Sequence, residues 1–153
     1  MGWPALTKEY LLPWLPLLMT VAGWFMVNWQ NNRRENRKEE RALLDAAKKL
    51  VIDMATKARA YMSAIDRNEE TEADIKAGVD QLEIELGRLP RYKQETELIN
   101  AVAAFGDAAT AADFESATRM PRKLSDAEPQ ALMAARNTLL TSLELLFSAR
   151  YPR

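Results

Sequence analysis

The apolar positions of the chain fall into an uninterrupted N-terminal stretch followed by amphipathic stretches. From Tyr10 to Asn32 no residue is charged, and leucine, methionine, valine, phenylalanine and tryptophan dominate. A helix rising ~1.5 Å per residue would extend ~35 Å over this stretch, and the hydrocarbon core of a bilayer is ~30 Å thick. The pattern therefore predicts a transmembrane helix over residues 10–30, preceded by a short N-terminal segment, residues 1–9.

Aromatic side chains flank the predicted span and suit the two interfacial belts of a membrane helix. They are Tyr10 and Trp14 at one end, and Trp24 and Trp29 at the other. The alternatives are a buried core helix and a cleaved signal peptide. A core helix rarely stays uncharged for so long, and a signal peptide needs a basic region before its apolar stretch, where only Lys8 stands. Length, flanks and aromatic placement together favour the membrane helix.

A group of cations follows the predicted span. It consists of Arg33, Arg34, Arg37, Lys38 and Arg41. On a helix these side chains share an arc of ~140°, and they greatly outnumber the cations before the span. The positive-inside rule therefore places the N-terminus outside and the rest of the chain in the cytoplasm. The same face could contact anionic lipid, but membrane topology alone accounts for such a group.

The segment after the span resembles a known group of proteins. It reads Gln-Asn-Asn-Arg-Arg-Glu-Asn-Arg-Lys-Glu over residues 30–39. Uncharacterised bacterial single-span proteins carry a similar Asn-Asn-x-Arg-Glu-x-Arg-Lys-Glu segment at the inner face of the membrane. The resemblance covers the span and about ten residues beyond it. It implies a location in the bacterial inner membrane, and it implies no activity.

The first two amphipathic stretches predict two helices. The first helix runs from about Arg33 to Ile65. Its expected buried positions are Leu43, Ala47, Leu50, Met54, Ala58, Tyr61 and Ile65. A polar turn at 68–70 and a capping box of Thr71 and Asp74 open the second helix, and Pro90 stops it. Its expected buried positions are Ile75, Val79, Leu82, Leu86 and Leu89.

Two more helices are predicted after Pro90. The third begins near Arg91, and Gly106 is a candidate break within it. Its expected buried positions are Leu98, Val102, Phe105, Ala109 and Ala112. A capping box of Ser125 and Glu128 opens the last helix, with Pro129 in its first turn. Its expected buried positions are Leu132, Ala135, Leu139, Leu143 and Leu146.

These elements define an all-α fold. No alternating β-branched run and no hairpin dipeptide is present, and short connections between helices favour antiparallel neighbours. We expect one N-terminal transmembrane helix followed by an antiparallel bundle of about four helices. Residues 31–67 would form the basic juxtamembrane segment and the first bundle helix, and residues 68–153 the remainder. No strong helix breaker separates the span from the first bundle helix, which leaves open that the two are one continuous helix; Asn31 and Asn32 are the most favoured position for a break.

Composition narrows the chemistry. The chain has no cysteine and no histidine, which removes disulfides, thiolate chemistry, the usual general base near neutral pH and nearly all zinc sites. Its net charge of −1 gives no general attraction for nucleic acid. We therefore assign no residue to catalysis, to a cofactor or to a metal, and expect neither nucleic acid nor a small-molecule substrate.

An acidic stretch invites a metal interpretation and does not support one. It contains Asp66, Glu69, Glu70, Glu72 and Asp74. A calcium loop of the EF-hand type starting at Asp66 would need glycine where Thr71 stands and glutamate where Ala77 stands. The preferred interpretation is a solvated turn with acidic residues at a helix N-terminus.

The leading functional hypothesis is a membrane-anchored interaction or scaffold protein that presents a cytoplasmic bundle. Its partners would be membrane lipid and either another protein or a second copy of the chain. The alternative is a phage-type lysis or envelope-disrupting protein. Inner-membrane spanin subunits resemble the chain in size and anchor, but they place a helical rod in the periplasm. An enzyme that uses carboxylates in the bundle is disfavoured, because no pair of perturbed acids can be argued.

Overall fold

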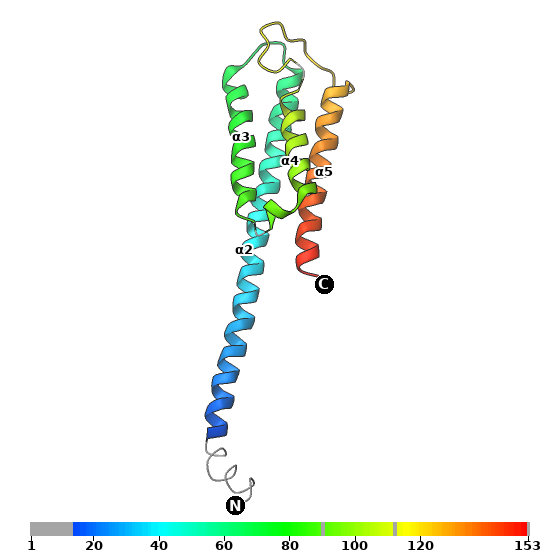
Figure 1. Cartoon of the computed structure of the whole chain (residues 1–153). Helices are drawn as coiled ribbons and strands as arrows, with labels where there is room; N and C mark the ends of the chain where they lie inside the picture. The colour runs from blue at the N-terminus through cyan, green and yellow to red at the C-terminus, as the bar shows by residue number, and fades with distance from the viewer. Residues whose placement is uncertain (1–13, 90, 112, 153) are drawn as a thin grey trace, which may run out of the picture. The chain divides into compact units, whose positions relative to one another are not determined.

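The computed structural model describes residues 14–89, 91–111 and 113–152, and the regular structure there is entirely helical. The elements are α2 (Leu15–Ser63), α3 (Glu69–Gly87), the 3₁₀ helix η3 (Tyr92–Gln94), α4 (Thr96–Ala109) and α5 (Ala127–Arg150) (Figure 1). No strand occurs among these residues. The predicted all-α class is confirmed.

The chain divides into two compact units, and the boundary lies between Glu39 and Glu40. Helix α2 supplies the described part of the first unit and one helix of the second. Of the two alternatives that the sequence left open, the structure has the continuous helix: Asn31 and Asn32, the favoured position for a break, are both helical. Asparagine has only a modestly poor helix propensity, unlike proline or glycine, so two of them do not end a helix.

Across the described ranges, none of the helices has the combination of length and apolar character that crossing a membrane requires. The transmembrane helix over residues 10–30 therefore stays a prediction. Residues 10–13, Tyr10 included, lie outside the described residues.

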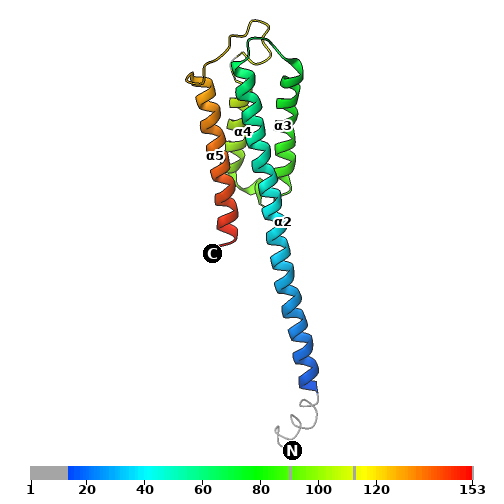
Figure 2. The same cartoon turned by 180° about the vertical axis from the view of Figure 1, so that it is seen from behind.

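The second unit is an antiparallel bundle of four helices. From Glu40 onward α2 contributes the first of them, and α3, α4 and α5 follow in turn. Each helix runs opposite to the one before it in the sequence (Figures 1 and 2). The chain crosses one end of the bundle between α2 and α3 and again, by the longer segment 110–126, between α4 and α5. The predicted bundle is confirmed.

The core of the bundle combines the apolar faces predicted for α3, α4 and α5 with a buried face of α2. Side chains with 0% exposed surface come from all four helices: Val51, Ala58, Ile75, Leu82, Leu86, Phe105, Leu132, Leu139 and Leu143. Within a helix these residues are four or seven positions apart, which places them on one side of that helix. Burial of each large apolar side chain favours folding by ~1.5–3 kcal/mol.

The buried face of α2 differs from the predicted one. Ile65 is 75% exposed, because α2 ends at Ser63. Four residues outside the predicted series are buried, namely Leu44, Val51, Ala55 and Met62. A helix that packs against several neighbours buries a wider stripe than one residue per turn, so the single series was too narrow.

Helix α4 also departs from the prediction. It begins at Thr96, because the residues before it form η3. Gly106 does not divide it and lies within the helix. A Cβ atom on Gly106 would lie 3.3 Å from Cγ1 of Val79. The glycine therefore allows α3 and α4 to approach closely.

The two predicted capping boxes are wrong. Helix α3 begins earlier, with Asn68 as its cap: the Asn68 side-chain oxygen accepts a hydrogen bond of 2.9 Å from the Thr71 N–H. Asp74 instead pairs with Lys57 at 2.6 Å. Helix α5 follows Asp126, which makes no side-chain cap, and Pro129 lies in its first turn as predicted. The predicted stop at Pro90, the predicted buried position Ala112 and the C-terminal residue Arg153 lie outside the described residues.

Candidate functional site

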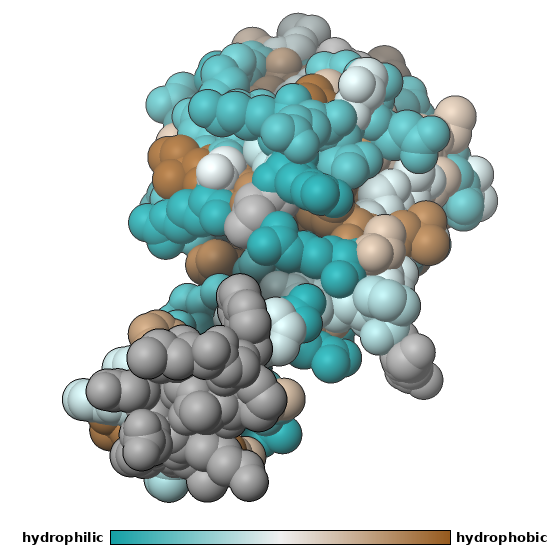
Figure 3. All heavy atoms as spheres, turned by 60° about the horizontal axis from the view of Figure 1, so that its bottom comes forward, coloured by the Kyte–Doolittle hydropathy of each residue, from teal (hydrophilic) through white to brown (hydrophobic). Residues whose placement is uncertain are grey.

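The first unit carries a continuous apolar surface. Its exposed large apolar side chains are Trp14, Leu15, Leu17, Leu18, Met19, Val21, Trp24, Phe25, Met26, Val27 and Trp29. Their exposed fractions run from 44% to 68%. By contrast, hydrophilic residues cover most of the bundle face seen in Figure 3, and its apolar residues lie in separate patches. An exposed apolar surface of this extent is typical of a segment that contacts lipid or another protein.

Four of the predicted topology residues follow this apolar surface. They are Arg33, Arg34, Arg37 and Lys38, all of them exposed. The Arg33 guanidinium lies 4.6 Å from the ring centre of Trp29, a cation–π contact. An aromatic ring and an arginine that stack in this way are suited to a water–lipid interface, where one end of the pair is apolar and the other is charged.

Arg41 was expected in the same basic group, and the structure places it elsewhere. It belongs to the bundle unit, and its two terminal nitrogens donate hydrogen bonds of 3.1 and 3.2 Å to the Glu144 carboxylate on α5. It also pairs with Asp45 at 3.2 Å, and its guanidinium lies 5.2 Å from the Phe147 ring centre. Arg41 therefore joins α2 to α5. A count of cations along the sequence could not reveal that the fold places the carboxylate of Glu144, on α5, next to Arg41.

Lys48 reinforces this junction. Its ammonium group pairs with the same Glu144 carboxylate, and its side chain is largely buried. Burial lowers the pKa of Lys48, and the neighbouring positive charge of Arg41 lowers that pKa further. At neighbouring positions Glu40 of α2 pairs with Arg150 of α5 at 2.9 Å. Charged pairs thus line the α2–α5 contact along one side of the bundle.

A buried polar cluster lies at the other end of the bundle from the Arg41–Glu144 pair, around the C-terminus of α2 and the N-terminus of α3. The Glu72 carboxylate, 2% exposed, accepts a hydrogen bond from the Tyr61 hydroxyl and bonds of 3.0 Å from both Nε and Nη2 of Arg67. The expectation of a solvated acidic turn is wrong for Glu72. Its carboxylate is taken out of water because both tyrosine and arginine satisfy it.

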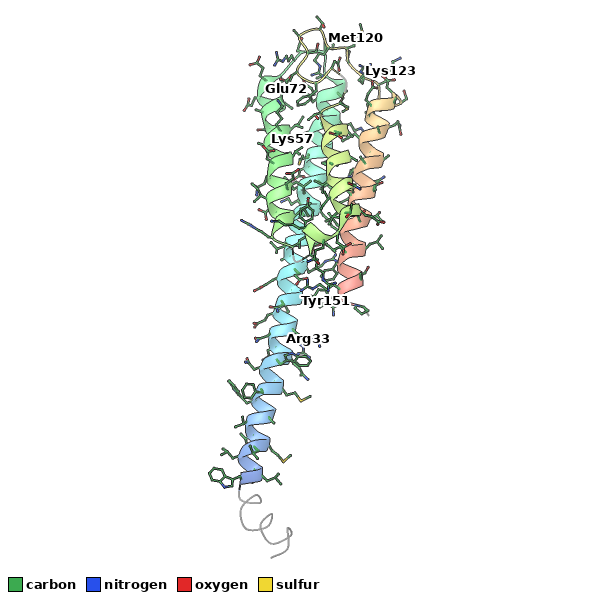
Figure 4. The ribbon with its side chains drawn as sticks, in the orientation of Figure 1. Arg33, Lys57, Glu72, Met120, Lys123 and Tyr151 are labelled. Atoms are coloured by element: carbon green, nitrogen blue, oxygen red, sulfur yellow. The ribbon has the colours of Figure 1, made fainter. Side chains whose placement is uncertain are left out.

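The longer connecting segment closes over this cluster. Arg119 donates to the Tyr61 carbonyl oxygen, and its guanidinium lies 3.7 Å from the centre of the Tyr61 ring. The Arg122 N–H donates to the Met62 carbonyl oxygen at 2.8 Å. The last carbonyl groups of a helix have no partner within it, so segment 110–126 caps the C-terminus of α2. Figure 4 shows Glu72 and Met120 at this same end of the bundle.

The surroundings of Glu72 and Tyr61 shift the pKa values of both groups. The hydrogen bond from Arg67 lowers the pKa of Glu72, and the bond from Tyr61 adds to that effect. Burial raises the pKa of Tyr61, and its hydrogen bond to Glu72 raises it further. A carboxylate held ionised and a tyrosine held protonated suit a structural bond better than proton transfer near neutral pH.

Sequence reasoning missed this cluster. Tyr61 was assigned to the apolar face and Glu72 to a solvated turn, while Arg119 was not singled out. The only local signal is the short spacing of Arg67 and Glu72, which is common on protein surfaces. Among the described residues no group of acidic side chains is arranged to hold a metal ion.

No protein-family model matches the sequence, and no curated protein or solved structure is significantly similar to it.

Proposed function

We propose that the chain is a membrane-anchored helical interaction protein. Residues 10–30 insert into a bacterial inner membrane as a single span, and the bundle of residues 40–153 is presented to a protein partner on the cytoplasmic side. The observation that carries the proposal is the exposed apolar surface from Trp14 to Trp29, followed at once by the cations at 33, 34, 37 and 38.

The apolar surface supports insertion on energetic grounds. Transfer of one large apolar side chain from water to a hydrocarbon environment is favourable by ~1.5–3 kcal/mol. The helix satisfies its own backbone hydrogen bonds, as a segment in lipid must. Trp24 and Trp29 lie at the end of the apolar run next to Arg33 and Arg34, in the order of an interfacial belt followed by cytoplasmic charge.

The bundle supports the interaction role. Its buried cluster and its α2–α5 ion pairs serve the fold, and among the described residues of the bundle no group of perturbed acids faces a cavity. A periplasmic rod of the spanin kind would require an extended helix, whereas residues 40–153 fold back on themselves. Presentation of a folded surface near the membrane is the function that these properties favour.

Membrane insertion is tested by alkaline carbonate extraction of membranes from a bacterial host that expresses the full chain. The wild-type chain should stay in the membrane pellet. A variant carrying Leu17→Glu, Val21→Glu and Phe25→Glu should move to the soluble fraction, because three buried charges make insertion strongly unfavourable. The matched control replaces three exposed apolar residues of the bundle, Ile84, Met120 and Leu145, with glutamate, and should stay in the pellet. Release of the wild-type chain by carbonate would contradict the proposal.

A further inference from the structure

A groove runs along the bundle between α3 and α4. It has a volume of about 410 Å³ and is open to solvent. The floor of the groove is formed by apolar residues without large side chains: Val79, Val102, Ala103 and Gly106. The contact between Gly106 and Val79 brings the two helices together beneath it, so the floor is shallow and free of bulky side chains.

The rim of the groove is acidic. Asp80 and Glu83 line it on α3, and Asp107 lines it on α4. None of the three makes an ion pair with any described residue. The one cation among the lining residues, Lys76, already pairs with Glu115 at 2.6 Å. An apolar floor between unpaired carboxylates is therefore the surface that the groove offers.

From this geometry we propose that the groove binds a basic amphipathic helix of a partner protein. The proposal deepens the interaction function and rests on it. A helix laid in a groove presents small apolar residues at intervals of three and four, and these would contact the floor. Lysine and arginine residues beside that apolar stripe would face the carboxylates of Asp80, Glu83 and Asp107. Charge complementarity selects a basic helix over an acidic or a neutral one.

Two properties of the groove suit a helix better than a small molecule. It is shallow, and its lining residues extend along about two turns of each helix, from Lys76 to Glu83 on α3 and from Val102 to Thr110 at the end of α4. It also lacks the enclosed apolar walls that surround most of a small ligand. The exposed Ala103 and the half-buried Gly106 allow a helix backbone to approach closely.

The test measures binding of a probe to the full chain in phosphatidylcholine nanodiscs. The probe is a fluorescein-labelled helical peptide of about 20 residues, long enough to form a stable helix, with an alanine–leucine stripe flanked by lysine. Its twin has glutamate in place of lysine. Fluorescence anisotropy, corrected for empty nanodiscs, should show saturable binding of the lysine peptide and none of the twin.

Two pairs of variants locate the site. Asp107→Lys should weaken binding roughly threefold to tenfold, because one attraction becomes a repulsion. Asp53→Lys, at an exposed aspartate of α2 outside the groove, should not. Ala103→Trp should abolish saturable binding by filling the groove, and Ala134→Trp, at an exposed alanine of α5, should leave it unchanged.

Three results would overturn the proposal. They are equal binding of the two peptides, equal effects of Asp107→Lys and Asp53→Lys, and self-association of the chain that the peptide displaces from the groove. The last result would assign the groove to a second copy. Insertion of the N-terminal anchor is measured separately, by co-elution of the chain with the nanodiscs. A chain that stays out of nanodiscs argues against the anchor and can be titrated with peptide in free solution.

Discussion

Tyr61→Phe isolates one bond of the buried cluster. The substitution removes the hydroxyl that donates to Glu72 and keeps the aromatic ring. The ring retains its contact with the Arg119 guanidinium and its edge-on contact with Phe114, whose ring centre is 5.4 Å away. Glu72 keeps its hydrogen bonds from Nε and Nη2 of Arg67, so its carboxylate is not left without a partner.

The expected cost follows from that geometry. A hydrogen bond to a charged acceptor contributes ~1.5–3 kcal/mol to stability. Because Glu72 remains satisfied by Arg67, the lower part of the range applies, ~1.5–2 kcal/mol. For a domain the size of the bundle, a loss of this size lowers the unfolding midpoint by roughly 6–8 °C.

Circular dichroism at 222 nm during heating measures this effect on the full chain in mild detergent. The matched control is Tyr92→Phe. Tyr92 packs against the core, and its hydroxyl makes no hydrogen bond among the described residues, so this change should move the midpoint little. Equal midpoints for the Tyr61 and Tyr92 variants would refute the reasoning, because the hydroxyl–carboxylate bond would then contribute nothing measurable.

Three further predictions concern the bundle. Leu139→Ala should destabilise it by ~2–5 kcal/mol in urea unfolding, and Leu145→Ala, at an exposed position of the same helix, should have little effect; similar losses would mean that the buried face of α5 is misassigned. A fragment of residues 31–153 should be helical without the apolar segment, and a random-coil spectrum would contradict an independent bundle. The pKa values of Glu72 and Asp113 lie below their ordinary values of 4.5 and 3.8. For Asp113 the main cause is the hydrogen bond that its carboxylate accepts from the Met120 N–H. The stabilisation that these two ionised carboxylates give the bundle should therefore be complete at a pH above their ordinary pKa values. It should be lost as the pH drops through their lower pKa values in the folded state. Denaturant midpoints that stay constant down to ~pH 3 would contradict this expectation.

The sequence predicted what local periodicity encodes. Leucines at helical intervals of seven and four residues, such as Leu132, Leu139 and Leu143, identify a helix and its buried face. Pro129 marks the first turn of α5. These features depend on residues close together in the chain, so spacing alone reveals them.

The features that the sequence did not predict depend on contacts between residues that are far apart in the chain. Arg41 looked like a membrane cation because its neighbours are cations, yet Glu144 lies 103 positions away and pairs with it. Arg119 reaches the last turn of α2 across 58 positions. The groove arises only when α3 and α4 pack together. No spacing rule within one segment could have shown these contacts.

Orientation in the membrane is the most direct test of the central claim. The full chain would be fused at its C-terminus to a reporter active only in the cytoplasm and, separately, to one active only in the periplasm. The proposal predicts strong cytoplasmic activity and a silent periplasmic reporter, because the cations after residue 32 are retained on the cytoplasmic side. Replacement of Arg33, Arg34, Arg37 and Lys38 by glutamine should weaken that bias. A strong periplasmic signal from the native sequence would contradict the proposal and favour the envelope-disrupting alternative.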